Sequence, residues 1–144
     1  MSDEQHRVRA IAEAQWAEDN ASRNLGMQIG EIGLGRAVMT MTVTDGMTNG
    51  HKTCHGGYIF TLADSAFAFA CNSYNQRAVA QMASVTFLAP GHQGDVLTAD
   101  AREVQKFGRS GIYDVRVTNQ KGDVIAEFRG HSRTIKGTHL PEEG

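Results

Sequence analysis

The longest apolar stretch of the chain lies near its middle, directly after His55. Between that histidine and Arg77, nearly every residue is small or apolar, and Asp64 is the only charged one. A helix that is apolar nearly all round is wrapped by other elements rather than packed on one side. The pattern therefore predicts a long buried helix from about Gly56 to Tyr74, with one carboxylate inside it.

The segments on both sides of this helix alternate between apolar and polar residues, which is typical of strands. Two strands joined by a glycine-rich turn are expected between Leu25 and Val43. A helical stripe of apolar residues predicts a further helix over residues 4–19. Four more strands are expected over residues 79–88, 96–106, 112–118 and 124–135. This order of elements indicates an α+β fold, in which a curved antiparallel sheet surrounds the long central helix.

Length and composition limit the remaining possibilities. The 144 residues fit a single domain over 1–144, with an N-terminal helical segment over 1–22 and a flexible tail over 137–144. The formal net charge of -2 provides no general basic field for nucleic acid or an anionic membrane. The apolar stretch is shorter than the roughly 20 residues that span a bilayer, and the polar N-terminus contains no signal-peptide core. Cys54 and Cys71 lack the spacing of a disulfide framework, so we expect a cytoplasmic protein that binds neither nucleic acid nor membrane.

Asp64 is the first candidate for chemistry. Moving even a neutral polar group into apolar surroundings without a hydrogen bond costs roughly 2–7 kcal/mol, and a charge costs more. A partly desolvated carboxylate in such a place is expected to act as a base or a nucleophile. The alternative is a structural carboxylate that caps a neighbouring element or pairs across a dimer.

The start of the same helix is the second candidate. The first amides of a helix have no partner within it, and the helix dipole makes this end positive, so Gly56 could hold a developing oxyanion. Asp64 lies eight residues later, about 12 Å along the helix axis. One helix therefore cannot bring both groups to the same carbonyl, whereas two antiparallel helices in a two-fold dimer can. If Gly56 and Asp64 do form one site, the sequence thus predicts an obligate homodimer. The alternative for Gly56 and Gly57 is a purely structural role, in which they allow helices to pack closely.

Two motifs carry a family resemblance that extends from about Leu25 to Ile135. They are Asn49-Gly50-His51-Lys52-Thr53-Cys54-His55-Gly56-Gly57 and Leu62-Ala63-Asp64-Ser65-Ala66-Phe67-Ala68. Together they resemble the hotdog-fold acyl-CoA thioesterases, and most of all the phenylacetate-degradation (PaaI) branch. Similar family blocks fall at Phe87-Leu88-Ala89-Pro90-Gly91 and Phe128-Arg129-Gly130.

The resemblance implies an enzyme that hydrolyses aryl-acyl-CoA thioesters, such as phenylacetyl-CoA or its hydroxylated forms. Asp64 would activate water or attack the thioester carbonyl itself, and Gly56 of the opposite subunit would supply the oxyanion amide. His55 and Asn49 would orient the thioester or the water, with Gly57 beside the substrate. The family also implies a homotetramer. Asp64 explains the chemistry without a metal or redox cofactor, so we expect no cofactor.

In related enzymes a serine or threonine on the strand after the helix assists the water. Ala80 falls at that place here, which leaves the water-positioning residue open, and Gln81 or Ser84 is our substitute. The phosphates of coenzyme A need cationic or amide partners. Two basic clusters are candidates, namely the turn of Lys106, Arg109 and Ser110 and the strand face of Arg129, His131 and Arg133. The strand face has a plain alternative as a solvated surface.

Two rival functions and one rival site stay open at this point. A hotdog dehydratase or hydratase could use His55 with Asp64, and a non-catalytic module could bind acyl-CoA without turnover. His51, Cys54 and His55 could be read as metal ligands. However, Asn49-Gly50 indicates a loop, and no second cluster of ligands stands out, so we expect no metal.

Overall fold

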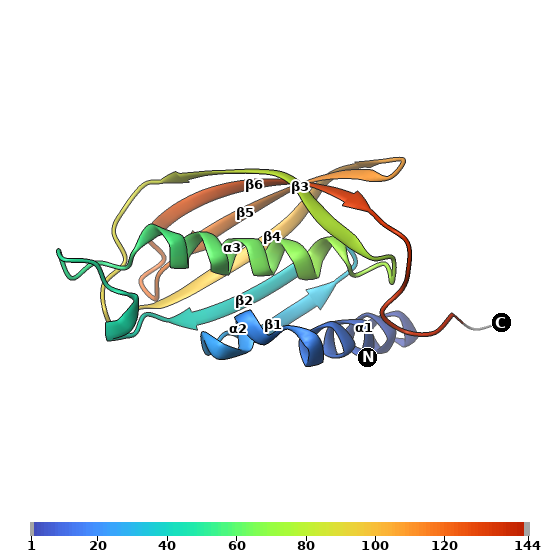
Figure 1. Cartoon of the computed structure of the whole chain (residues 1–144), viewed down its shortest axis with the longest axis horizontal. Coiled ribbons are helices and arrows are strands. Elements are labelled where there is room, and N and C mark those ends of the chain that lie inside the picture. The colour runs from blue at the N-terminus through green and yellow to red at the C-terminus, as the bar shows by residue number, and fades with distance from the viewer. Residues whose placement is uncertain (1, 143–144) are drawn as a thin grey trace.

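The structure, a computed structural model, describes residues 2–142 (Figure 1). The helices are α1 (Asp3–Glu18), α2 (Asn20–Asn24) and α3 (Gly56–Cys71), with a short 3-10 turn η1 (Asp45–Met47). The strands are β1 (Gln28–Gly33), β2 (Arg36–Thr42), β3 (Ala78–Phe87), β4 (Val96–Phe107), β5 (Ser110–Thr118) and β6 (Val124–Thr134). Every expected helix and strand is confirmed, with most ends shifted by a few residues.

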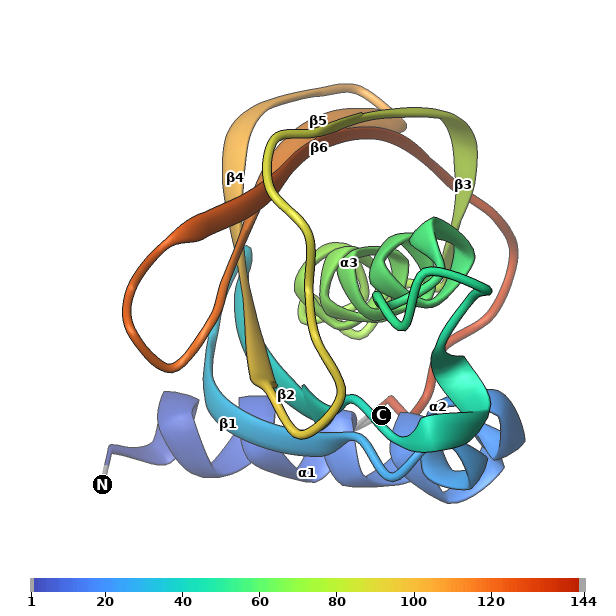
Figure 2. The ribbon, with the colours of Figure 1, turned by 90° about the vertical axis from the view of Figure 1, so that its left-hand side faces the viewer.

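The strands form one antiparallel sheet in the order β1-β2-β4-β5-β6-β3. Figure 2 shows this sheet curled around α3, which is seen nearly end-on inside it. The predicted arrangement of a curved sheet around a central helix is therefore confirmed. The same view shows that the curl stays open between β3 and the α2 region, so one side of α3 is not covered by strands.

The end of α3 was predicted wrongly, because the helix stops at Cys71 rather than at Tyr74. Asn72 explains the difference. Its side-chain Nδ2 donates to the carbonyls of Ala68 at 2.8 Å and Ala78 at 3.1 Å, and its Oδ1 accepts from the Ala78 amide at 2.9 Å. These bonds satisfy the helix end and turn the chain directly into β3.

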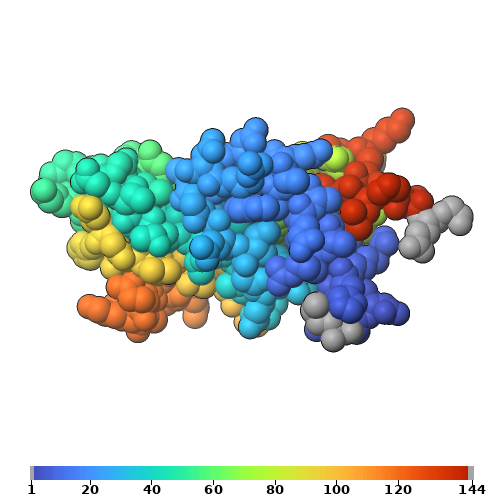
Figure 3. Space-filling model, turned by 90° about the horizontal axis from the view of Figure 1, so that it is seen from below, coloured from blue at the N-terminus to red at the C-terminus, as the bar shows by residue number. Residues whose placement is uncertain are grey.

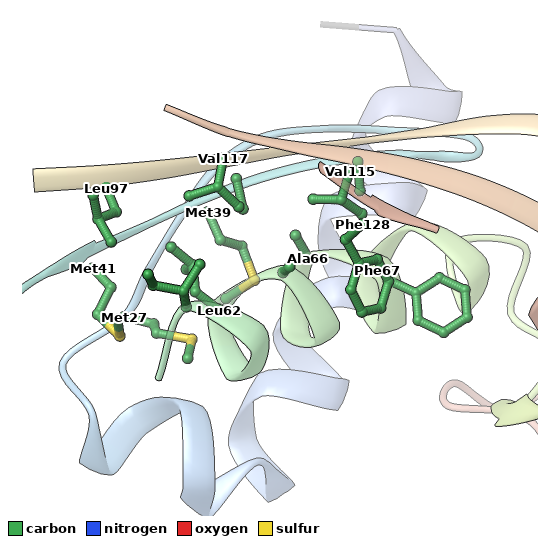
Figure 4. Packing of buried hydrophobic residues seen from close by; sticks show 14 of the residues in the cluster. Met27, Met39, Met41, Leu62, Ala66, Phe67, Leu97, Val115, Val117 and Phe128 are labelled. Carbon is green, nitrogen blue, oxygen red and sulfur yellow. The ribbon is translucent and has the colours of Figure 1, made fainter. Parts of the chain in front are cut away.

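The core fixes how α3 is rotated inside the sheet (Figure 4). Leu62, Ala66 and Phe67 are fully buried against the inner faces of the strands. The ring of Phe67 lies 5.6 Å from that of Tyr113 and 5.8 Å from that of Phe128. The ring also packs closely against Gly130, where an added Cβ would come within 2.8 Å of it. Packing as close as this determines which residues of α3 face outward.

The residues that face outward form a stripe on α3 at helical spacing, which we call the uncovered stripe. It consists of Gly57, Thr61, Asp64 and Ala68, none of them fully buried. Next to this open side lies β3, an edge strand of the sheet. Its exposed hydrophobic residues continue into the following loop, and they are Val79, Met82, Phe87 and Leu88. This part of the surface is unusually apolar for an exposed strand edge.

The N-terminal helices cover the underside of the molecule (Figure 3). α1 begins with a capping box in which the Ser2 hydroxyl accepts from the Gln5 amide at 3.1 Å, and it buries Val8, Ile11 and Ala12. Within residues 2–142, no helix has the length and hydropathy needed to cross a membrane.

The C-terminal segment runs beside the end of α3. Asn75 holds it through hydrogen bonds to the backbone of His139 and Leu140, and the Arg77 amide donates to the Gly137 carbonyl at 3.0 Å. These contacts weigh against free movement of residues 137–140. The flexibility of the 137–144 tail stays a prediction, and residues 143–144 lie outside the described part.

Candidate active site

The N-terminus of α3 presents one free backbone amide. His55 is the N-cap, and its Nδ1 accepts from the Gly57 amide at 2.9 Å, so the neutral imidazole carries its proton on Nε2. The Tyr58 amide donates to the His55 carbonyl at 3.0 Å. Within the described residues the Gly56 amide has no acceptor. The first turn of the helix therefore offers the Gly56 N–H to a ligand, at the positive end of the dipole.

Phe87 comes from β3 and lies directly against this glycine. A Cβ on Gly56 would meet the Phe87 ring at 2.9 to 3.3 Å, so only glycine fits here without moving the ring. The two residues line a shallow hollow of about 500 Å³ together with Cys54, Ile59, Leu88, Ala89 and Pro90. Sequence reasoning noted the block around Phe87 but did not assign it to the site, since no local pattern connects it to residue 56.

Asp64 lies half-buried on the uncovered stripe, two turns further along α3. Burial raises the pKa of its carboxyl group, and the negative charge of Asp19 raises it further. In the part of the chain that the structure describes, no donor hydrogen-bonds to the Asp64 carboxylate. A carboxylate that is desolvated and unpaired binds a proton more readily than an ordinary one, which suits a general base.

Gly56 and Asp64 are not brought together within one chain. They occupy the same straight helix, eight residues and about 12 Å apart along its axis. A carbonyl that accepts from the Gly56 amide therefore lies out of reach of Asp64 of the same copy. The structure thus confirms that Gly56 and Asp64 lie on one helix, too far apart to share a carbonyl. The dimer that would bring them together remains a proposal.

Asn49 lies in the loop before α3 and acts as a turn former. Its Oδ1 accepts from the amides of His51 at 2.9 Å and Thr53 at 3.3 Å, and from the Thr53 hydroxyl at 3.1 Å. These bonds fold the loop that leads into His55, the N-cap of α3. Asn49 and His55 thus belong to one loop, and a direct role of Asn49 towards substrate stays a prediction.

Gln81 and Ser84 lie on the exposed edge strand β3. Gln81 occupies a bulge between Ala80 and Met82, where the pairing with β6 shifts register. Among residues 2–142, neither Gln81 nor Ser84 uses its side chain in a hydrogen bond. Both are therefore available to a substrate or to a second copy of the chain.

The basic turn and the His-Gly-Gly motif lie at opposite ends of α3. The Lys106 ammonium sits 3.6 Å from the centre of the Tyr74 ring, and Ser110 pairs with Arg133 beside the start of β3. This hairpin is thus next to the C-terminal end of α3, while Gly56 is at the other end. The 16 residues of the helix separate the two by roughly 24 Å.

The second basic cluster lies on the outer face of β6 and is partly engaged. Arg129 binds Asp114 through two hydrogen bonds, of 2.6 and 2.8 Å, and this pairing lowers the pKa of the Asp114 carboxyl group. His131 is half-buried two residues further along. Because the Arg129 guanidinium already has a carboxylate partner, Arg129 is a weaker candidate for binding phosphate than Lys106 or Arg109.

The alternative metal ligands do not form a cluster. Cys54 is buried, and its thiol contacts the His55 carbonyl, while His51 is exposed in the turn. Over the described residues, no group of three or more His, Cys, Asp or Glu side chains is arranged to hold a metal ion.

Known proteins match this chain over most of its length. A family model described as the thioesterase superfamily matches residues 51–126. The Escherichia coli acyl-coenzyme A thioesterase PaaI is 45% identical over 133 residues, which cover 92% of this chain and 95% of that protein. The solved structure of E. coli PaaI, from the phenylacetic acid degradation operon, superposes with a TM-score of 0.91 over 93% of this chain and 97% of that one.

A Streptococcus mutans structure with bound acetyl-CoA is 30% identical and has a TM-score of 0.74, covering 78% of this chain and 90% of that one. The fold, the His-Gly-Gly helix start and these similarities agree with one another. The chain therefore belongs to the thioesterase superfamily, as a hotdog-fold acyl-CoA thioesterase of the phenylacetate-degradation (PaaI) branch.

Proposed function

We propose that this enzyme hydrolyses aryl-acyl-CoA thioesters, of the phenylacetyl-CoA or hydroxyphenylacetyl-CoA type, to coenzyme A and the free acid. The observation that carries the proposal is the unpaired, half-buried Asp64 on the uncovered stripe of the helix that also presents the unpaired Gly56 amide. The aryl substrate class is supported by the likeness to E. coli PaaI, which comes from a phenylacetic acid degradation operon.

In the proposed reaction the thioester oxygen accepts a hydrogen bond from the Gly56 amide, which stabilises the negative charge that develops there. Asp64 takes a proton from water as the water oxygen bonds to the carbonyl carbon. The carbon–sulfur bond then breaks, and the leaving thiolate receives the proton from Asp64. In the other version of the proposal, the Asp64 carboxylate attacks the carbonyl carbon, and the carbon–sulfur bond breaks to release the coenzyme A thiolate. Water then hydrolyses the resulting anhydride, which restores the Asp64 carboxylate, and one proton of that water goes to the thiolate.

We propose that each site is shared by two copies of the chain. The uncovered stripe contains the small residues Gly57, Thr61 and Ala68, which allow a second helix to approach closely, and the apolar edge of β3 lies beside it. An antiparallel pair of α3 helices then places Gly56 of one copy near Asp64 of the other. A two-fold axis produces two such sites, so an obligate homodimer is proposed, with a homotetramer by likeness to the family.

The remaining contacts to substrate are assigned by position. Gln81 or Ser84 holds the water, since both are unpaired on the strand next to the stripe. Lys106, Arg109 and Ser110 bind the phosphates of coenzyme A at the C-terminal end of α3. Arg129 and His131 are the second choice for the same task, since Arg129 is engaged by a carboxylate.

We also propose a cytoplasmic location. Among the described residues the two cysteines, Cys54 and Cys71, are both buried and unpaired. Free cysteines are the usual state in a reducing compartment.

The experiment is thiol release from aryl-acyl and straight-chain acyl-CoAs by the wild type, Asp64→Ala and Asp64→Asn. We expect aryl-acyl-CoAs to be preferred and both variants to lose orders of magnitude in kcat while still binding substrate. Unchanged kcat in the variants would remove Asp64 from the mechanism. With a 3-hydroxyacyl-CoA as substrate, enoyl absorbance without thiol release would indicate a dehydratase. Binding of the acyl-CoAs without turnover would indicate a non-catalytic module.

A further inference from the structure

The break between α1 and α2 holds a second carboxylate against α3. Asp19 ends α1 with φ -91° and ψ 84° and is at the same time the N-cap of α2. Its Oδ1 accepts from the Ser22 amide at 2.9 Å, and its Oδ2 accepts from the Ser22 hydroxyl at 2.7 Å. Both oxygens are thus fixed by one residue, so the side chain has little freedom to turn away.

A buried hydrogen bond connects this break to the helix that carries Asp64. The hydroxyls of Ser22 and Ser65 lie 2.7 Å apart, and these residues are only 1% and 8% exposed. Because the Ser22 hydroxyl donates to Asp19, the Ser65 hydroxyl must donate to Ser22. Ser65 directly follows Asp64 in α3, so the chain of bonds anchors Asp19 to the same helical turn as the catalytic candidate.

Asp19 and Asp64 also face the same side of α3. Asp19 lines a cavity of about 370 Å³ whose wall includes Ala68, the next residue of the uncovered stripe after Asp64. That stripe places Ala68 one helical turn beyond Asp64 on the same face. The break between α1 and α2 therefore lies beside the end of the stripe that contains Asp64 and Ala68.

The other charged groups around this cavity have partners of their own. Arg77 pairs with Glu18 at 3.8 Å and donates to the Thr138 carbonyl at 3.1 Å, and His139 bonds through Nε2 to Asn72 at 2.7 Å. β3 contains no charged residue, and α3 contains none besides Asp64. The charge of Asp19 is accordingly the one that raises the pKa of the Asp64 carboxyl group in addition to burial.

We propose that Asp19 is a positioning residue of the active site, a second carboxylate that Ser22 and Ser65 hold beside Asp64 and that controls the protonation of Asp64. This inference rests on the proposed role of Asp64 as the base. A negative neighbour makes Asp64 a stronger base, and it moves the acid limb of the pH–rate profile to higher pH. The N-terminal helices thereby contribute to catalysis without touching the substrate.

The test compares the wild type with Asp19→Asn, in which the asparagine keeps an oxygen acceptor for the Ser22 amide and is itself a good N-cap. Two readouts are needed: the acid limb of kcat against pH, and the titration of the Asp64 carboxyl carbon by ¹³C NMR, assigned from its loss in Asp64→Asn. We expect both midpoints to move to lower pH in Asp19→Asn. Glu13→Gln removes one charge from the exposed face of α1 and should leave both midpoints unchanged.

Each outcome decides one claim. Unchanged NMR titration of Asp64 in folded Asp19→Asn overturns the inference. A shifted NMR titration with an unshifted acid limb shows that Asp19 acts on the protonation of Asp64. The same result contradicts Asp64 as the base, and it is then the proposed function that is wrong. If Asp19→Asn does not fold, Asp19→Ser removes the same charge with another good N-cap and is judged by the same two readouts.

Discussion

Gly56→Ala separates a catalytic role of the helix start from a structural one. The substitution keeps the amide N–H and adds only a methyl group, whose carbon would lie 2.9 Å from Cζ of Phe87. Within one chain Phe87 is 51% exposed, so its own fold leaves the ring free to turn away, and alanine is favoured over glycine within a helix by roughly 0.5–1 kcal/mol. We therefore expect the free energy of unfolding to change by no more than about 1 kcal/mol.

Activity should respond much more strongly. The methyl group and the displaced ring crowd the approach of the thioester oxygen to the amide. Losing one oxyanion donor costs on the order of 10²–10³ in kcat, and we expect a loss approaching that range. The assay is thiol release at saturating substrate, together with chemical denaturation. Gly33→Ala is the control, because this glycine at the end of β1 lies outside the site and no atom lies within 4 Å of the added methyl group. If Gly56→Ala keeps kcat within about threefold of the wild type, the oxyanion argument is wrong.

Three further predictions follow from the packing and the charges. Gly130→Ala places a methyl group 2.8 Å from the buried Phe67 ring, so it should cost about 1–3 kcal/mol and lower Tm by roughly 3–10 °C; an unchanged melting curve would show that the core is looser than described. Asp64→Asn should unfold at a higher temperature than the wild type at neutral pH. The pKa of the Asp64 carboxyl group is higher in the folded than in the unfolded protein, so the wild type loses stability as the pH rises from about 3.8, the ordinary value, through the pKa of the folded state. A stability gain that persisted at pH 3 would contradict this origin. Arg109→Ala should raise KM for acyl-CoA several-fold with kcat retained, and the increase should be larger than in Arg129→Ala. Steady-state kinetics on both variants checks this, and a larger increase in Arg129→Ala would contradict it.

Much of the fold could be predicted from the pattern of the chain. The strands alternate cleanly, and the apolar stretch after His55 is too uniform for a surface helix, so a wrapped helix followed with little ambiguity. The end of α3 could not be read in this way. It depends on Asn72, whose side chain bonds to the Ala78 backbone, a contact that exists only once the chain has turned.

The site could be predicted only where its residues are close in sequence. His55, Gly56 and Asp64 lie within ten positions, and helix geometry relates them directly. Phe87 and Asp19 belong to distant segments, and they reach α3 through sheet pairing and through a buried serine pair. Such contacts leave no local periodicity, so the structure was needed to find them.

The central claim is that each site takes Asp64 from one copy and Gly56 from the other. The most direct measurement mixes two inactive variants, Asp64→Ala and Gly56→Ala, in equal amounts, unfolds and refolds them together, and assays thiol release. Random pairing in a shared site leaves about a quarter of the sites with both intact residues, so we predict recovery of about a quarter of the wild-type activity. A site built within one chain has no intact combination in the mixture, and the absence of recovered activity in well-folded mixed dimers would contradict the account.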